Sequence, residues 1–242
     1  MKTEIALGFD HEHPLAAVRH HHVGRADRLC RDTSPGAAGA RVEISNAPEA
    51  QRLPSDWKQV ATATDLDRIA RTGAAWENGL NEARAHRHGS EIDAEGPLLD
   101  PTSALARPAL PPGTYRCRIV KLGFGPGKRG KSFQTFKPFT CFVSVEEALL
   151  VFIKANGTDL PAGRLWDDSE TRLVFLGAMA PRPGLPAPAY STEPERDRSG
   201  VVERVGDFRW RLVIPWQSKD AKIEVMELLP DTPPPAPVSA SG

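Results

Sequence analysis

The chain has 242 residues, 40% hydrophobic and 26% charged, a size and composition typical of one globular domain, or two at most. Lysine and arginine together number 31, as do aspartate and glutamate, so the zero net charge argues against nucleic acid or an anionic membrane as the partner. The 23 prolines and 20 glycines favour many short elements over a helical bundle.

Residues 1–53 show no hydrophobic periodicity and are predicted to form a disordered N-terminal tail. No signal peptide is visible there, because the charged and polar residues 10–13 interrupt the stretch that could serve as its apolar core. The longest apolar run in the chain is 148–153, far shorter than the roughly 20 residues that span a bilayer. We therefore expect no membrane span, and either a cytosolic protein or a natural start that differs from the given one.

One amphipathic helix is predicted between Thr64, a good N-cap residue, and Gly89, a plausible stop. Its apolar residues recur at alternating spacings of three and four, which puts one stripe along a helix of about five turns. The stripe consists of Leu66, Ile69, Gly73, Trp76, Leu80 and Ala83.

A polar connector is predicted after the helix, over residues 90–112.

From Gly113 onward the hydrophobic period changes to two, the period of half-buried strands. Turn-forming pairs such as Asn156-Gly157 and Gly206-Asp207 separate several of the apolar runs. The pattern predicts eight strands, at 114–122, 137–145, 148–154, 162–166, 171–177, 201–205, 208–214 and 222–228.

Eight short strands in series predict a mainly β fold, either an up-and-down antiparallel barrel of about eight strands or a strongly curved sheet. Closure into a barrel would remove exposed strand edges. Strands 148–154 and 171–177 are apolar on both faces, so we expect the amphipathic helix to pack outside the barrel and cover them. The predicted domain covers residues 54–230, followed by a second disordered tail over 231–242.

Two of the three cysteines are predicted to face one another. Cys117 and Cys141 lie symmetrically about Arg129, so a hairpin centred there opposes them directly and gives both strands an apolar face on the same side. Opposed cysteines can form a disulfide if the protein is exported, whereas in a reducing compartment they would be two buried free thiols. Cys30 lies in the predicted tail and is given no role.

Glu203 is the one acidic residue on an otherwise apolar strand face. A hairpin with a two-residue loop at 206–207 pairs it with Trp210. A carboxylate buried on such a face is unfavourable unless it is paired. Two interpretations stay open. In the first, Glu203 contacts a ligand beside Trp210. In the second, either it has a partner within the protein, such as Lys121 or Arg209, or another register turns it outward.

All seven histidines precede residue 90, so none lies in the predicted β region. This excludes a Ser/His or Cys/His catalytic site inside the barrel, and histidine metal ligands there. The cluster His20-His21-His22 lies in the predicted tail, where no fixed geometry would hold a metal. We therefore predict that the protein is not an enzyme and has no catalytic residue, metal site or cofactor.

Three sequence blocks have the order and spacing of a known family: 113–123 followed by Cys141, 172–177, and 206–212. Over about 57–230 the chain resembles an uncharacterised bacterial domain-of-unknown-function family of exported proteins. The resemblance implies a periplasmic location and transfers no catalytic residue, because the family has no assigned activity. The chain departs from that family at its N-terminus, where we suspect a misassigned start. At the level of fold alone, the strand pattern is similar to calycin-type, lipocalin-like barrels.

Two functions compete. In the first, the protein is a monomeric binding barrel for a small, partly apolar ligand under the Pro-rich loop 179–200. In the second, it is a protein-interaction or enzyme-inhibitor module that acts through loops 123–136 and 179–200. The candidate ligand-binding residues of the first function are Tyr115, Trp166, Glu203 and Trp210.

Overall fold

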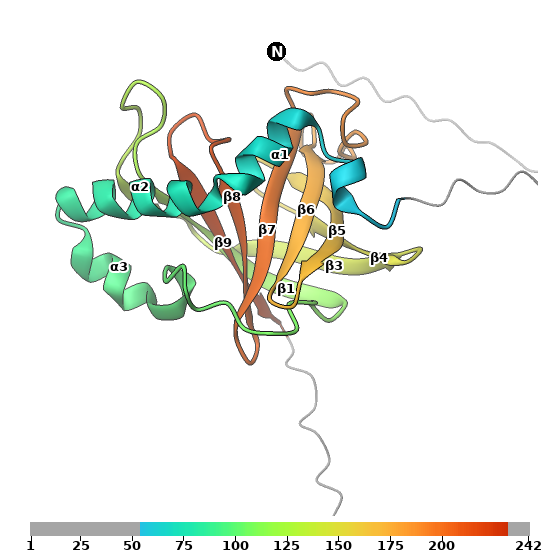
Figure 1. The fold of residues 1–242 in the computed structure, drawn as a ribbon, viewed down its shortest axis with the longest axis horizontal. Helices are drawn as coiled ribbons and strands as arrows, with labels where there is room; N and C mark the ends of the chain where they lie inside the picture. The colour runs from blue at the N-terminus through green and yellow to red at the C-terminus, as the bar shows by residue number, and fades with distance from the viewer. Residues whose placement is uncertain (1–53, 232–242) are drawn as a thin grey trace, which may run out of the picture. The chain divides into compact units, whose positions relative to one another are not determined.

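The computed structural model describes residues 54–231, which form a β-barrel with helices against one side of its outer surface (Figure 1). The predicted disordered tails at 1–53 and 231–242 lie outside the described residues, apart from Asp231. The elements are, in chain order, η1 (Trp57–Gln59), α1 (Ala63–Ala70), α2 (Thr72–Ala85), α3 (Gly89–Glu95), η2 (Gly96–Leu98), β1 (Gly113–Leu122), β2 (Phe133–Thr135), β3 (Phe139–Glu146), β4 (Leu149–Lys154), β5 (Pro161–Ser169), β6 (Arg172–Met179), β7 (Asp197–Gly206), β8 (Arg209–Pro215) and β9 (Ile223–Pro230).

A pairing between the first and last strands closes the barrel. Each strand from β3 to β8 is antiparallel to the next, β1 pairs with β3, and β1 pairs with β9 over Tyr115–Leu122. The extra strand β2 pairs with Val120–Leu122 of β1, beyond Cys117, where the β1–β3 pairing ends. The eight strands β1 and β3–β9 thus form a closed antiparallel barrel, as predicted, and closure leaves no long unpaired edge.

Alternation along the strands divides the apolar side chains between two cores. On β6, for example, Phe175 points into the barrel, where it meets Phe152 edge-on. Its neighbours Val174 and Leu176 point outward and join a second core with Trp76 of α2. This outer core buries the outward face of β6, which explains why the strand is apolar on both faces. The main strand contacts of α1 and α2 are with β1 and β7–β9, so the helices do not cover β4 as predicted; outward residues of β4 line a cavity beside the Pro-rich loop instead.

The helical region differs from the predicted single helix. Arg71, with φ −94° and ψ 16°, separates α1 from α2, and the N-cap of α1 is Thr62 rather than Thr64. Beyond the break the buried face of α2 includes Gly79, whose added Cβ would lie 2.8 Å from a methyl of Ile223. Gly73 of the predicted stripe is instead exposed. The prediction assumed one uninterrupted helix. The break at Arg71 rotates α2 relative to α1, so the residues of α2 do not follow the helical period that begins in α1.

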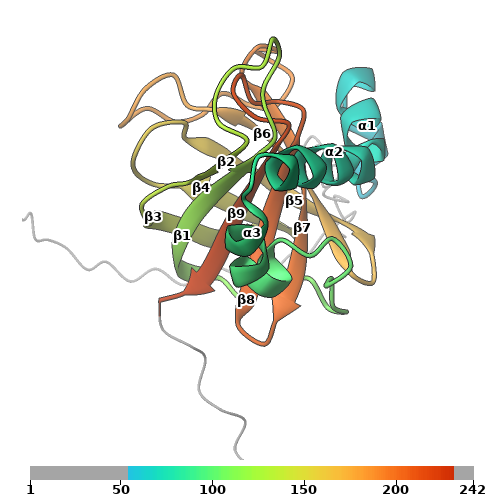
Figure 2. The same cartoon turned by 90° about the vertical axis from the view of Figure 1, so that its left-hand side faces the viewer.

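The predicted polar connector at 90–112 is also wrong in its first part. It contains most of α3 and all of η2, which lie beside α2 on the helix-covered side of the barrel (Figure 2). Leu98 and Leu99 are buried in the outer core. A helix of seven residues is too short to display a clear period, so its apolar residues gave no signal.

The structure confirms a disulfide between Cys117 and Cys141, with Cα atoms 6.1 Å apart, but in another register than predicted. Cys141 pairs with Tyr115, and Cys117 pairs with Phe139, so the two cysteines are diagonal neighbours. The connection contains β2 and is not a symmetric hairpin. Because the register moved by two residues, both side chains still point into the barrel.

Candidate functional site

Two of the predicted ligand-binding residues lie inside the barrel and contact each other. Tyr115 and Trp210 are both buried, and their rings meet edge-on with centroids 6.2 Å apart. The Tyr115 hydroxyl donates a 2.6 Å hydrogen bond to the carbonyl of Pro111, and burial raises the pKa of Tyr115 to about 12. These rings belong to the filled part of the barrel interior, and neither lines any of the cavities described below.

Glu203 points out of the barrel, and its partner is Arg211. A β-bulge between Arg204 and Gly206 shifts the register, so Glu203 pairs with Arg211 and not with Trp210, as predicted. The Arg211 guanidinium lies 2.7 Å from the Glu203 carboxylate. The partly buried charge on Glu203 is therefore compensated within the protein, and the register turns it outward, as the second interpretation supposes. The partners named for it, Lys121 and Arg209, are wrong, because these pair with other carboxylates.

Arg211 in turn ties the segment after α3 to the barrel. It is fully buried, stacks 5.0 Å from the ring centroid of Trp76, and donates hydrogen bonds to the carbonyls of Pro97, Leu98 and Asp100. A guanidinium has five N–H donors in a fixed plane, which suits it to gathering several acceptors at a turn. This arrangement is structural, since it leaves no polar atom of Glu203 or Arg211 facing a cavity.

Trp166, the remaining predicted ligand-binding residue, lies on the outer face of β5. It belongs to the core between the barrel and the helices and lines a cavity of about 630 Å³ beneath the Pro-rich loop. The structure therefore does not bring Tyr115, Trp166, Glu203 and Trp210 together. Two fill the interior, one forms an outer ion pair, and one lines an outer cavity.

The open end of the barrel interior has a different character, which the sequence reasoning missed. Four charged residues occupy inward-facing positions near the ends of their strands, and three of them lie two residues from an inward apolar side chain. They line two adjoining cavities, which we call together the barrel mouth. Lys121 and Glu224 line both cavities, Arg198 lines the one of about 440 Å³, and Lys154 lines the one of about 610 Å³. The four residues are Lys121 on β1, Lys154 on β4, Arg198 on β7 and Glu224 on β9. The period-two pattern that turns such a residue inward was visible in the sequence, as in the series Tyr115, Cys117, Ile119 and Lys121.

Lys121 is neutralised by carboxylates. Its ammonium lies 2.9 Å from Asp220 and 2.8 Å from Glu224. Burial would lower the pKa of Lys121, but the attraction of Glu224 and Asp220 outweighs it, so the pKa is raised. This ion-paired group forms one wall of the barrel mouth.

Lys154 and Arg198 face the mouth without an ion pair among residues 54–231. The Lys154 ammonium lies 4.3 Å from the ring centroid of Phe139 and donates to the carbonyl of Thr158. Arg198 donates through Nη1 to backbone carbonyls, including a 2.7 Å bond to Asp197. Burial lowers the pKa of both side chains, the sign of cations that lack a close counter-charge.

Below these cations the floor of the mouth is apolar. Ile119, Ile214 and Met226 all line the 440 Å³ cavity that Lys121, Arg198 and Glu224 also line. Most of the other residues that line this cavity are polar or charged, so an apolar floor lies under a polar rim. Its size is that of a small-molecule site.

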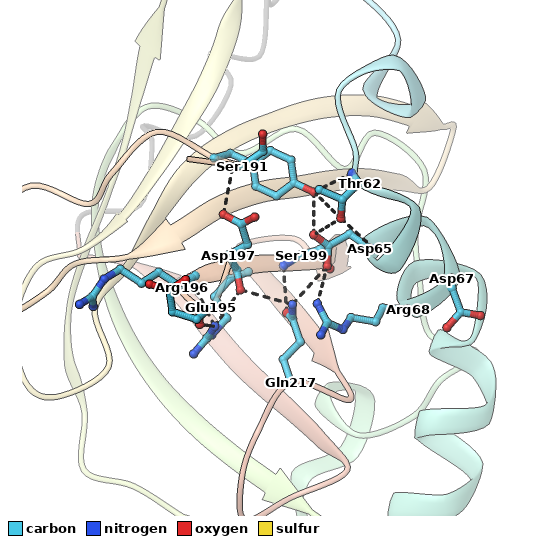
Figure 3. Close-up of polar contacts among 12 residues, drawn as sticks. Thr62, Asp65, Asp67, Arg68, Ser191, Glu195, Arg196, Asp197, Ser199 and Gln217 are labelled. Atoms are coloured by element: carbon cyan, nitrogen blue, oxygen red, sulfur yellow. Dashed lines mark hydrogen bonds and ion pairs between the residues drawn. The ribbon is translucent and has the colours of Figure 1, made fainter. Parts of the chain in front are cut away.

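A second polar constellation lies outside the barrel, around the fully buried Asp65 of α1 (Figure 3). Its carboxylate accepts hydrogen bonds of 2.6 Å from the Tyr190 hydroxyl and 2.8 Å from both Ser199 Oγ and Arg68. Burial would raise the pKa of Asp65, but these hydrogen bonds outweigh it and lower the pKa. A carboxylate with its acceptor positions filled is a poor general base, so this cluster joins elements and offers no reactive group.

Asp197 lies in the same cluster and is shifted in the opposite direction. It is buried and accepts a 2.9 Å hydrogen bond from the Ser191 N–H. Burial, with the nearby charge of Asp65, raises its pKa.

Within residues 54–231, no group of three or more His, Cys, Asp or Glu side chains is arranged to hold a metal ion, and no helix is long and apolar enough to cross a membrane.

Comparison with known proteins supplies a family but no activity. A search of curated proteins and a search of solved structures each found no match. The similarity to calycin-type barrels therefore stays a prediction, while the barrel itself is established by the strand pairings. Residues 57–228 match the model of a family described as Domain of unknown function (DUF4893), and the chain belongs to that family.

Proposed function

We propose that the protein is an exported, non-enzymatic binding protein that holds a small anionic ligand with an apolar part in the barrel mouth. The observation that carries this proposal is that two inward-facing cations, Lys154 and Arg198, line two adjoining cavities that share Ile119 in their walls. A carboxylate or sulfonate between them would supply the counter-charge that both lack. An alkyl or aryl group would then extend toward Ile119, Ile214 and Met226.

The charges around the mouth favour one net negative ligand. Lys121 already forms ion pairs with Asp220 and Glu224. The other carboxylate of the mouth, the exposed Asp159, forms no ion pair with Lys154 or Arg198. Because the site is partly desolvated, an incoming anion interacts with these cations more strongly than it would at the open surface. An uncharged ligand of the same shape gains only the apolar contact.

Export is supported by the disulfide. Cys117 and Cys141 are bonded inside the barrel, and structural disulfides persist in oxidising compartments such as the periplasm. The resemblance to exported proteins points the same way. Native mass spectrometry of the protein isolated from its host tests this part directly: an intact disulfide and a retained small anion support an exported carrier, and a reduced chain without adduct contradicts it.

Isothermal titration calorimetry with decanoate, and with 1-decanol as its uncharged counterpart, tests the site. We expect decanoate to bind and decanol to bind at least about tenfold more weakly. Lys154→Met and Arg198→Met should each weaken decanoate about tenfold and leave decanol unchanged, because each removes a charge-assisted hydrogen bond.

Lys131→Met is the matched control, since Lys131 is an exposed lysine outside the cavities of the mouth. Equal decanoate affinity in Lys154→Met, Arg198→Met and Lys131→Met would refute the site. Thermal unfolding of each variant confirms that a lost affinity does not come from a lost fold.

The second candidate is an interaction module, and one observation favours it. Each loop proposed for this role carries an exposed large apolar residue, Phe136 at 36% and Leu185 at 43% exposure. Capture of one stable periplasmic partner by the wild type, lost in Phe136→Ser or Leu185→Ser, would support this function over the carrier.

A further inference from the structure

Three segments that are distant in the sequence meet beside the C-terminal end of α2. The loop that joins β1 to β2, residues 123–132, stands next to that helix end (Figures 1 and 2). The Phe124 N–H donates a 2.8 Å hydrogen bond to the Glu82 carboxylate, and the rings of Phe124 and His86 meet edge-on with centroids 4.9 Å apart. The loop and the helix end therefore present their exposed side chains on the same side of the protein.

The third segment, residues 216–222, packs against the same loop. An added Cβ at Gly125 would lie 2.2 Å from the carbonyl oxygen of Lys219, and one at Gly130 would lie 2.4 Å from that of Asp220. Only residues without a Cβ allow two backbones to come this close. Residues 82–93, 123–132 and 216–222 thus form one continuous face.

This face carries an excess of positive charge. All the carboxylates of the three segments already have a basic partner, in the pairs Glu82–Lys222, Arg84–Asp93, Lys121–Asp220 and His88–Glu91. Five exposed cations of the same segments form no ion pair within residues 54–231. We call these five the basic face: Arg87, Lys128, Arg129, Lys131 and Lys219.

Fixed turns hold two of these cations at protruding positions. Arg87 follows α2 with φ 70°, and the next N–H, that of His88, donates a 3.1 Å hydrogen bond to the carbonyl of Ala83, as in a Schellman helix end. Lys128, with φ 57°, closes a tight turn through a 3.1 Å hydrogen bond from its N–H to the Gly125 carbonyl. The cations therefore project from convex turns and do not line a groove.

The composition of the face indicates which kind of partner it suits. None of the large apolar side chains that are exposed among residues 54–231 belongs to the three segments. Protein interfaces depend on buried apolar and aromatic anchors, and single-stranded nucleic acid stacks on exposed aromatic rings, so the face suits neither well. Convex turns that carry only positive charge suit a flat, negatively charged surface. The disulfide also favours an oxidising compartment, away from the nucleic acid of the cell.

We propose that the basic face binds the surface of a bilayer that contains anionic phospholipids, reversibly and without insertion. The zero net charge of the chain does not oppose this binding, because charges act over about one Debye length, about 8 Å at physiological salt. Only the local excess of cations therefore counts. Lys121 of the barrel mouth pairs with Asp220 beneath the loop, so the mouth opens near the proposed contact, but the proposal does not depend on the function of the mouth.

Cosedimentation of the full-length protein with vesicles tests the proposal. At about 0.1 M salt, we expect binding to vesicles of phosphatidylglycerol and phosphatidylcholine in equal parts, none to phosphatidylcholine alone, and loss of binding at about 0.5 M salt. The triple variant Lys128→Gln, Arg129→Gln, Lys131→Gln should bind the anionic vesicles about a hundredfold more weakly, because each cation contributes about fivefold.

The matched control is the triple variant Lys58→Gln, Arg107→Gln, Arg116→Gln. It loses the same charge from exposed cations that form no ion pair within residues 54–231 and that lie outside the three segments. It should bind the anionic vesicles within about twofold of the wild type. Thermal unfolding of both variants establishes that they fold.

Three results would overturn the proposal. An equal loss of binding in the two triple variants would mean that overall charge, and not the basic face, attracts the vesicles. Equal binding to anionic and neutral vesicles, or binding to neither, would remove the anionic bilayer as the partner. A wild type that binds a DNA duplex but not the anionic vesicles would assign the basic face to nucleic acid.

Discussion

The phenol hydroxyl of Tyr190 donates a 2.6 Å hydrogen bond to the carboxylate of Asp65, joining the Pro-rich loop to the first turn of α1. The same carboxylate holds Ser199 of β7, so three segments distant in the sequence meet at one buried group (Figure 3). Burial, together with this hydrogen bond to Asp65, raises the pKa of Tyr190 to about 12, so the phenol stays protonated and remains a donor at any physiological pH.

Asp65 should stabilise the fold in a pH-dependent way. Its pKa is lower in the folded chain, so the ionised form favours folding above the unfolded pKa of about 3.9, and this contribution is lost as the pH falls toward the folded value. Asp65→Asn should lower the free energy of unfolding by about 2 kcal/mol at pH 7, because an amide cannot accept all the hydrogen bonds donated there. Urea unfolding at about pH 7 and about pH 3 measures the difference, which should shrink at the lower pH.

Asp197→Asn is the internal control for that series. The folded pKa of Asp197 is raised, so its carboxylate favours folding only when protonated, and that contribution is lost as the pH rises through the folded value. The amide oxygen of asparagine can still accept the Ser191 N–H, so this variant should not be destabilised at neutral pH. A cost for Asp65→Asn that is independent of pH would contradict the assignment.

Arg211 should be among the least replaceable side chains of the described chain. Arg211→Met leaves Glu203 unpaired under the segment after α3 and frees three backbone carbonyls, so we expect a loss of about 3 kcal/mol in the free energy of unfolding. Adding Glu203→Gln should recover part of this loss by removing the unpaired charge. The exposed pair Arg84–Asp93 serves as a control, and Arg84→Ala should have little effect.

The disulfide should contribute measurably to stability. It closes a loop with a sequence separation of 24 residues, which restricts the unfolded chain by about 3 kcal/mol in the loop-entropy account. The double variant Cys117→Ser, Cys141→Ser should therefore unfold at lower urea concentration than the oxidised wild type. The reduced wild type should resemble the variant, and an oxidised protein no more stable than the reduced one would contradict this prediction.

Two glycines should respond to alanine with opposite signs. In Gly177, which pairs with Gly163 across β5 and β6, an added Cβ would lie 2.2 Å from the carbonyl oxygen of Ala162. Gly177→Ala should cost about 2 kcal/mol or more, because the backbone of the barrel would have to move. Gly73, in α2, has no heavy atom within 4 Å of an added Cβ, so Gly73→Ala should stabilise the protein by about 0.5 kcal/mol. Thermal unfolding distinguishes the two outcomes.

The sequence was most informative where a pattern repeats within one element. Period-two alternation from Gly113 onward indicated all the strands except β2, and their serial order predicted either a barrel or a strongly curved sheet. The β1–β9 pairing, which no local pattern predicts, closes the barrel. The shared apolar face of Cys117 and Cys141 predicted their bond despite a wrong register, since an even shift preserves the face. The absence of histidine after residue 88 was equally plain from the residues themselves.

The candidate sites depended on which strands meet, and only the tertiary structure decided that. A single β-bulge near Gly206 turned Glu203 away from Trp210 and toward Arg211. Lys154 and Arg198 lie 44 positions apart in the sequence, and they line adjoining cavities only because closure arranges β4 and β7 around one barrel. Local periodicity reports which way a side chain points relative to its own strand, whereas a binding site is made by contacts among distant strands, and no local pattern encodes those.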